Sequence, residues 1–181
     1  VGLDGEIVQV EVDYNPHSLP AFTVVGLPDT AVQESRERVR AAIRNSGLQF
    51  PNKRYTVNLA PASLRKEGPA YDLPMAVGVL ASTDQVPLSA LTGAVFVGEL
   101  SLDGTVRHVS GILPITHRAW LEGYECIFVP EEDAPQAALV PDIDVIPVRS
   151  LGHLVEHLYS VNRVPPFVRP DVHTDVPLDL D

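Results

Sequence analysis

The sequence predicts an α+β fold, in which a mixed sheet packs against helices. Two observations support this class. Short segments that alternate apolar and polar residues, as half-buried strands do, are interspersed with segments whose apolar residues recur at helical spacing. Some strand segments follow each other directly, through the hairpin signal Asp103-Gly104, and others are separated by helices. Hairpins and crossovers together favour one main sheet of mixed strand direction.

The predicted elements follow from local patterns of apolar residues and from turn signals. The first helix has Thr30 as its N-cap and Gln33 at capping-box spacing, and it stops at Gly47. The second helix carries almost no charge on any face, so we expect it to be buried on all sides. The predicted strands cover residues 7–12, 21–26, 55–60, 94–102, 105–109, 125–130 and 144–148, and the predicted helices cover residues 30–45, 72–83, 112–123, 131–139 and 150–160.

Composition is typical of a globular protein. The chain has 181 residues, of which 45% are hydrophobic and 20% charged, and its apolar runs are too short to cross a bilayer. The N-terminus does not resemble a secretory signal. The single cysteine, Cys126, cannot form an intrachain disulfide and fits a reducing compartment. We therefore expect a cytoplasmic protein that does not bind membranes.

Charge is distributed unevenly along the chain. The net charge is −11, yet residues 30–66 contain eight basic and two acidic residues, a local charge of +6. The helix over residues 30–45 presents Arg36, Arg40 and Arg44 as a stripe beside its apolar face. Such a stripe could contact phosphates of DNA. The alternatives are a solvated helix face partly paired with Glu37 and a docking surface for another domain.

Three catalytic or binding motifs are only partly matched by the sequence. Neither lysine, Lys53 or Lys66, follows a glycine as a phosphate-binding P-loop requires, so the chain cannot bind a nucleotide by that route. His153, Glu156 and His157 match the H-x-x-E-H spacing of zinc peptidases, but a third protein ligand is missing and a solvated histidine pair is the better interpretation. Ser63 and Lys66 have S-x-x-K spacing, but a Gly-Pro break prevents the helix which that dyad needs.

The loop "RKEGPAYDLP", residues 65–74, combines a charged approach with the start of the buried helix. Active sites are often built in this way, but the residue at the start of the helix is Ala70, which has no reactive group. Asp72 is a possible cap for the helix. We expect the loop, through Arg65 and Lys66, to serve as a contact surface.

Two long segments resemble the N-terminal domain of the magnesium-chelatase-like AAA+ ATPases, the family of the competence protein ComM. They are "SLPAFTVVGLPDTAVQESRERVRAAIRNSG" and "VNLAPASLRKEGPAYDLPMAVGVLA". The resemblance implies a fold like ribosomal protein S5 domain 2, which is also the fold of the Lon proteolytic domain. It also implies that an ATPase module follows this domain and that this module, not this chain, binds ATP and Mg²⁺.

The similarity to Lon suggests why the loop over residues 65–74 carries no reactive side chain at its end. In Lon-type peptidases a Lys-Asp-Gly-Pro-Ser-Ala-Gly loop carries the catalytic serine, and a segment after a hairpin carries the catalytic lysine. Here "KEGPAYD" places Ala70 at the serine position, and "GELSLDGTVRHVSGIL" places Leu113 at the lysine position. Because a Ser-Lys dyad needs a hydroxyl and an amine, we expect no peptidase activity and no cofactor or metal site in this chain.

The expected function is therefore a non-catalytic domain that docks on an ATPase ring or guides a substrate to it. The expected partners are the ATPase module of the same protein and its hexamer neighbours, with DNA as a further candidate. The parent protein is expected to act as a branch-migration helicase in transformation and recombination. The alternatives are a residual hydrolase that uses Ser63, Lys66 or Asp72, and a regulatory domain of a metal-chelatase-type ATPase.

We expect a domain over residues 1–160 followed by a proline-rich linker over residues 161–181. The chain begins without methionine and ends in a segment with several prolines and no apolar periodicity. These two features suggest a piece of a longer protein.

Overall fold

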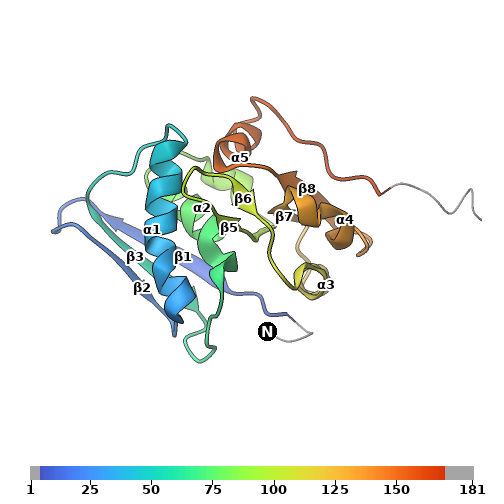
Figure 1. The fold of residues 1–181 in the computed structure, drawn as a ribbon, viewed down its shortest axis with the longest axis horizontal. Helices are drawn as coiled ribbons and strands as arrows, with labels where there is room; N and C mark the ends of the chain where they lie inside the picture. The colour runs from blue at the N-terminus through green and yellow to red at the C-terminus, as the bar shows by residue number, and fades with distance from the viewer. Residues whose placement is uncertain (1–4, 170–181) are drawn as a thin grey trace, which may run out of the picture.

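A computed structural model describes residues 5–169 and confirms the α+β class (Figure 1). The chain forms two halves, each with a three-stranded sheet and its own helices. The strands are β1 (Gln9–Asn15), β2 (Ala21–Val25), β3 (Arg54–Ala60), β4 (Ala94–Phe96), β5 (Glu99–Leu100), β6 (Val106–Arg107), β7 (Cys126–Pro130) and β8 (Asp144–Val148). The helices are α1 (Thr30–Asn45), α2 (Asp72–Ser82), α3 (Ile112–Leu121), α4 (Ala134–Ala137) and α5 (Leu151–Leu158), with short 3₁₀ turns η1 (Pro69–Tyr71), η2 (Leu88–Leu91) and η3 (Glu131–Asp133).

The first half is a mixed sheet covered on one face by α1 and α2. Its strand order is β1-β3-β2, with β1 antiparallel and β2 parallel to β3. Tyr55, Val57 and Leu59 of β3 are buried in the main apolar cluster, whereas Glu11 and Asp13 of β1 are exposed. The alternation of apolar and polar residues in these strands therefore reflects a sheet with one covered face and one open face.

The second half is a parallel sheet with the order β4-β7-β8. Along β7 and β8 the buried residues divide between two apolar clusters. Phe128 and Ile146 join the cluster that includes α5, and Ile127 and Val145 join the cluster that includes α3 and α4. Both faces of this sheet are covered, which explains why its strands are almost continuously apolar.

The expectation of one main sheet was wrong. The predicted strand over residues 94–102 is broken at Gly98, where the chain leaves β4 and then forms the short β5–β6 hairpin. Gly98 donates its N–H to the carbonyl of Ala70 and accepts from the N–H of Leu73, at 3.1 and 3.0 Å. A Cβ at this position would lie 2.8 Å from a methyl carbon of Val106. The close approach to the start of α2 therefore separates β4 from the β5–β6 hairpin, so residues 94–102 contribute to two different sheets.

The N-cap of α1 is Asp29, not Thr30. One carboxylate oxygen of Asp29 accepts from the N–H of Val32 at 2.8 Å, and the other accepts from the N–H of Gly68 at 3.1 Å. Asp29 thus satisfies the first turn of the helix and also holds the loop before α2. A carboxylate can bind two donors in this way, whereas the hydroxyl of Thr30 cannot bridge two segments as readily.

The boundary at residue 160 stays a prediction, and residues 170–181 of the predicted linker lie outside the described residues, as do residues 1–4 of the predicted domain. Between them, the N–H of Val164 donates to Nδ1 of His157 at 2.9 Å, and the N–H of Phe167 donates to the carbonyl of Val145 at 2.7 Å. The first part of the predicted linker is therefore attached to α5 and β8. Between residues 5 and 169, none of the helices has the length and apolar character needed to cross a bilayer.

Candidate functional site: a cleft between the two sheets

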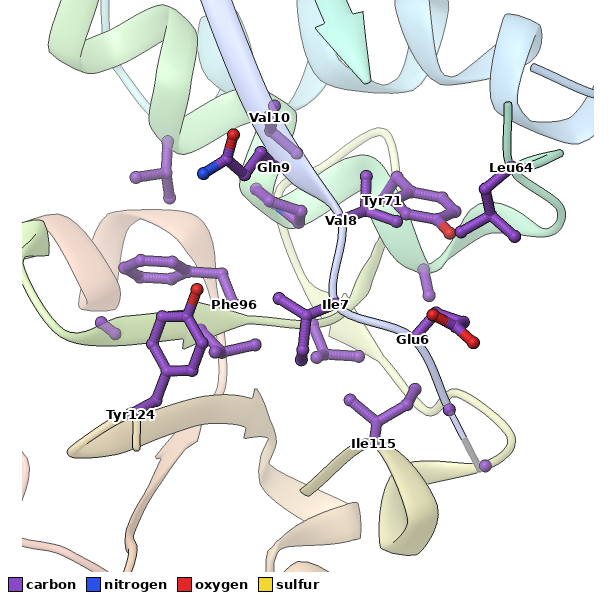
Figure 2. Close-up of a pocket in the computed structure, with 18 of the residues that line it drawn as sticks. Glu6, Ile7, Val8, Gln9, Val10, Leu64, Tyr71, Phe96, Ile115 and Tyr124 are labelled. Carbon is purple, nitrogen blue, oxygen red and sulfur yellow. The ribbon is translucent and has the colours of Figure 1, made fainter. Parts of the chain in front are cut away.

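A cleft of about 690 Å³ is lined by residues of both halves. One wall is the segment 5–11, which includes the start of β1, and another is β4. Figure 2 shows the chain at Ile7 descending between Tyr71 and Leu64 on one side and Phe96 and Tyr124 on the other. The volume is in the range of small-molecule and peptide pockets, and the lining is mostly apolar.

Ala70 lies in this cleft, at the end of the charged loop. It is half-buried in η1, and its carbonyl is held by the N–H of Gly98 at 3.1 Å. Tyr71 beside it also lines the cleft, and burial, followed by the charges of Asp29, Glu67 and Glu6, raises the pKa of its hydroxyl. The loop thus presents a methyl group where a reactive side chain would have direct access to the cleft.

The sequence predicts that Asp72 caps α2, but in the structure Asp72 instead joins three elements. The N-cap of α2 is Tyr71, and the fully buried carboxylate of Asp72 accepts from the hydroxyl of Ser35 and the N–H of Leu100. The Nε atom of Arg38 lies 2.6 Å from the same carboxylate, and this bond raises the pKa of the guanidinium. Because every oxygen of this buried charge has partners, Asp72 is a structural connection between α1, α2 and β5.

Lys66 is not part of a contact surface, which corrects the prediction for this residue. Its side chain is fully buried, its Nζ donates to the carbonyl of Pro61, and burial lowers the pKa of the amine. The backbone of Lys66 is bonded on both sides to the turn at residues 27–29, which draws the side chain inside. Arg65 and Glu67 remain exposed at the cleft, with 3.4 Å between their charged groups.

Leu113 lies in the first turn of α3 and packs against the same apolar cluster as Ala70. Leu113 itself does not line the cleft, but Pro114 and Ile115 do. The two positions that the sequence comparison with Lon singled out therefore belong to one neighbourhood, and neither carries a hydroxyl or an amine.

The arginine stripe of α1 lies away from the cleft. Arg36 is half-buried and donates to the carbonyls of Gln33 and Phe22. Arg40 is ion-paired with Glu37 at 3.0 Å and lies over the rings of Phe22 and Phe50. Arg44 is exposed, and its guanidinium also lies over Phe50. Part of the positive charge of this stripe is therefore already engaged in contacts within the domain.

The two alternative motifs are not assembled as catalytic sites. Ser63 is exposed whereas Lys66 is buried, so the S-x-x-K pair does not form a dyad. His157 is buried and accepts a hydrogen bond from Val164, which corrects the prediction of a solvated histidine pair, because α5 packs this side of the helix inward. No group of three or more potential metal ligands occurs among residues 5–169.

Two features, one in the cleft and one outside its lining, were not predicted from the sequence. Ser110 is exposed and lines the cleft, because Gly111 adopts a left-handed conformation and turns the chain into α3. Outside the residues that line the cleft, Nδ1 of the exposed His108 lies 2.5 Å from the buried carboxylate of Asp133, and this contact raises the pKa of His108. The Ser-Gly dipeptide was a turn signal in the sequence, whereas the 25-residue separation of His108 from Asp133 gave no local signal.

The comparisons with known proteins give a consistent family assignment. The family described as subunit ChlI of Mg-chelatase matches residues 10–133. An uncharacterized protein of Mycobacterium tuberculosis is 48% identical over 153 residues, which cover 84% of this chain and 30% of that protein. Competence protein ComM of Haemophilus influenzae is 39% identical over 165 residues, which cover 91% of this chain and 32% of that protein.

A more distant similarity extends to peptidases. Lon protease 2 of Bacillus subtilis is 25% identical over 142 residues, which cover 78% of this chain and 25% of that protein. The chain thus spans about a third or less of the length of these curated relatives.

Proposed function

Because this chain belongs to the family of ChlI, a subunit of Mg-chelatase, we propose that it is a non-catalytic domain of a magnesium-chelatase-like AAA+ ATPase, which docks on the ATPase ring or guides a substrate to it. The observation that supports the proposal most directly is the methyl group of Ala70 in the cleft. A nucleophilic mechanism needs a hydroxyl or thiol with a base beside it. Among the described residues that line the cleft there is no lysine, histidine or cysteine, and the serine and carboxylates present are Ser110, Glu6, Glu11 and Glu67.

We propose that ATP and Mg²⁺ bind to a module outside this chain. The described residues do not fit these ligands, since Lys66 is buried, Lys53 follows no glycine-rich loop, and no cluster of metal ligands occurs within residues 5–169. The ATPase module of the same protein and the neighbouring subunits of a hexamer are the proposed partners.

We also propose that the parent protein acts on DNA in the cytoplasm, as a branch-migration helicase used in transformation and recombination. The support is the similarity to a relative named competence protein ComM, together with the basic character of residues 30–66. Insertion of a metal into a porphyrin, which the family name suggests, is the alternative for the parent, and it would depend on the ATPase module.

The proposal predicts that the purified chain neither degrades casein nor reacts with a serine-directed fluorophosphonate. Two serines make the experiment specific, because Ser63 belongs to the S-x-x-K pair and Ser110 lines the cleft. The matched variants are Ser63→Ala and Ser110→Ala. Labelling or cleavage that disappears in either variant would overturn the non-catalytic assignment and identify the nucleophile.

A further inference from the structure

We propose that the cleft binds an extended peptide segment with small apolar side chains and flanking basic residues, which adds as a strand to the edge of the segment 7–11. This inference rests on the proposed guiding function and gives it a substrate class, an extended stretch of a partner polypeptide. Three properties of the cleft support this assignment: its free strand edges, its apolar lining and the charges around it.

Two strands that line the cleft lie at the edges of their sheets. β1 pairs only with β3, and β4 pairs only with β7. Within the described residues, no backbone hydrogen bond joins the segment 5–8, or the other edge of β1, to another segment. Unpaired edges of this kind are where extended peptides add to a sheet, since the backbone groups supply affinity without regard to sequence.

The segment 7–11 is the edge that we assign to the peptide, because all five of its residues line the cleft. A strand of that length extends roughly 17 Å. β4 contributes only three residues, Ala94 to Phe96, and forms the opposite wall.

The side chains in the cleft would accommodate apolar groups on alternate positions of the peptide. Figure 2 shows Ile7, Phe96 and Tyr124 around one part of the cavity, and Leu64 and Tyr71 around another. Ala70, which lines the same cavity, adds only a methyl group to it. A bound peptide would therefore be held beside a position that has no nucleophile and would remain uncut.

The charge around the cleft favours basic residues in the peptide. Glu6, Glu11 and Glu67 line it, and the one lining cation in the described chain, Arg65, is already paired with Glu67. Complementary charge at the rim of an apolar site raises association rates and rejects like-charged ligands. An acidic peptide of the same length should therefore bind more weakly.

The test is fluorescence anisotropy of the whole chain with a labelled Lys-Val-Ala-Val-Lys peptide. Two matched probes are the same peptide with its central amides N-methylated and a version with glutamate in place of lysine. We expect saturable binding, with about tenfold loss on N-methylation and a similar loss for the acidic probe. Absence of saturation up to about 1 mM, or equal binding of the N-methylated probe, would overturn the inference.

Protein variants locate the site. Ala70→Leu fills the cleft and should reduce affinity about tenfold, whereas Ala138→Leu adds the same atoms to another half-buried alanine outside the cleft and should have no effect. If Ala70→Leu does not fold, Glu6→Lys with Glu67→Lys, at two exposed positions, should weaken binding of the basic probe and strengthen binding of the acidic one. Unchanged binding in folded variants would contradict the assignment.

Cleavage of the probe separates the two proposals. Binding without cleavage supports both, and absence of binding overturns only the peptide inference. Binding with cleavage that Ser110→Ala abolishes would overturn the non-catalytic function and retain the cleft as the binding site.

Discussion

At the scale of single residues, Asp72 is the side chain on which the geometry of the site depends. It is fully buried, and its partners Ser35, Arg38 and Leu100 belong to α1 and to the strand β5 that follows the cleft wall. A buried carboxylate is tolerated only when its lone pairs are occupied by donors. Asp72, which the sequence predicts to be a helix cap, therefore fixes the position of the loop that ends in Ala70.

Replacement of Asp72 tests this interpretation. Asp72→Ala leaves the guanidinium of Arg38, whose side chain is 18% exposed, without its buried partner. We expect the free energy of unfolding to fall by about 3–5 kcal/mol. The measurement is urea denaturation followed by circular dichroism.

A matched control uses the other carboxylate near Arg38. Glu34 lies 3.7 Å from the same guanidinium, but its side chain is 64% exposed. Glu34→Gln should change stability by less than about 0.5 kcal/mol. Equal effects of the two substitutions would show that burial of Asp72 does not determine its contribution.

At the scale of elements, α1 combines a structural face with a basic face. Val32, Val39 and Ile43 are buried on its apolar face, and Arg36, Arg40 and Arg44 form a stripe beside that face. The contacts of the first two arginines with Phe22 and Glu37 reduce the charge that is free to meet a phosphate. Binding of DNA through this helix should therefore be weak and dependent on ionic strength.

The double variant Arg36→Glu with Arg40→Glu should abolish a salt-sensitive mobility shift of duplex DNA. The control is Arg118→Glu, a charge reversal at an arginine on α3 that is paired with Glu122. Thermal unfolding should be followed for each variant, since Arg36 also donates to the backbone. If the unmodified chain gives no shift at low ionic strength, the stripe is better assigned to docking of the neighbouring module.

Most elements could be predicted from the sequence, because the signals involved are local. The β5–β6 hairpin follows from Asp103-Gly104, and the burial of seven of the 11 residues of α2 follows from the nearly uniform apolar character of that helix. The separation of β4 from the β5–β6 hairpin could not be predicted, because it depends on the contact of Gly98 with Ala70, 28 residues earlier in the chain. The burial of Lys66 was missed for the same reason, since backbone bonds to the turn at residues 27–29 place its side chain inside.

At the scale of the whole molecule, His157 connects α5 to the C-terminal segment. Burial lowers its pKa, and the charges of Arg163 and His153 act in the same direction. The unfolded chain therefore binds a proton at this residue at higher pH than the folded chain does. The stabilising effect is complete above the ordinary pKa of 6.5 and decreases as the pH falls below it.

The prediction concerns the difference between the wild type and His157→Asn. We expect the variant to be less stable by about 1–2 kcal/mol near pH 7.5, with the difference shrinking toward pH 5.5. Thermal unfolding across this range is the measurement, and the exposed His117→Asn is the control. His108 acts in the opposite direction, because Asp133 raises its pKa and its contribution is lost as the pH rises. A pH-independent difference for His157→Asn would contradict the linkage.

The attachment of residues 164–167 also determines how mechanical load would enter the domain. A pull applied beyond residue 169 reaches β8 through the Phe167–Val145 bond and reaches α5 through the Val164–His157 bond. Both contacts belong to the half that contains β4, whereas β1 belongs to the other half. Because the cleft has one wall in each half, tension on the C-terminal side would reach the wall formed by β4, through β8 and β7, before the wall formed by β1. A pull applied at that end would therefore act on the width of the cleft.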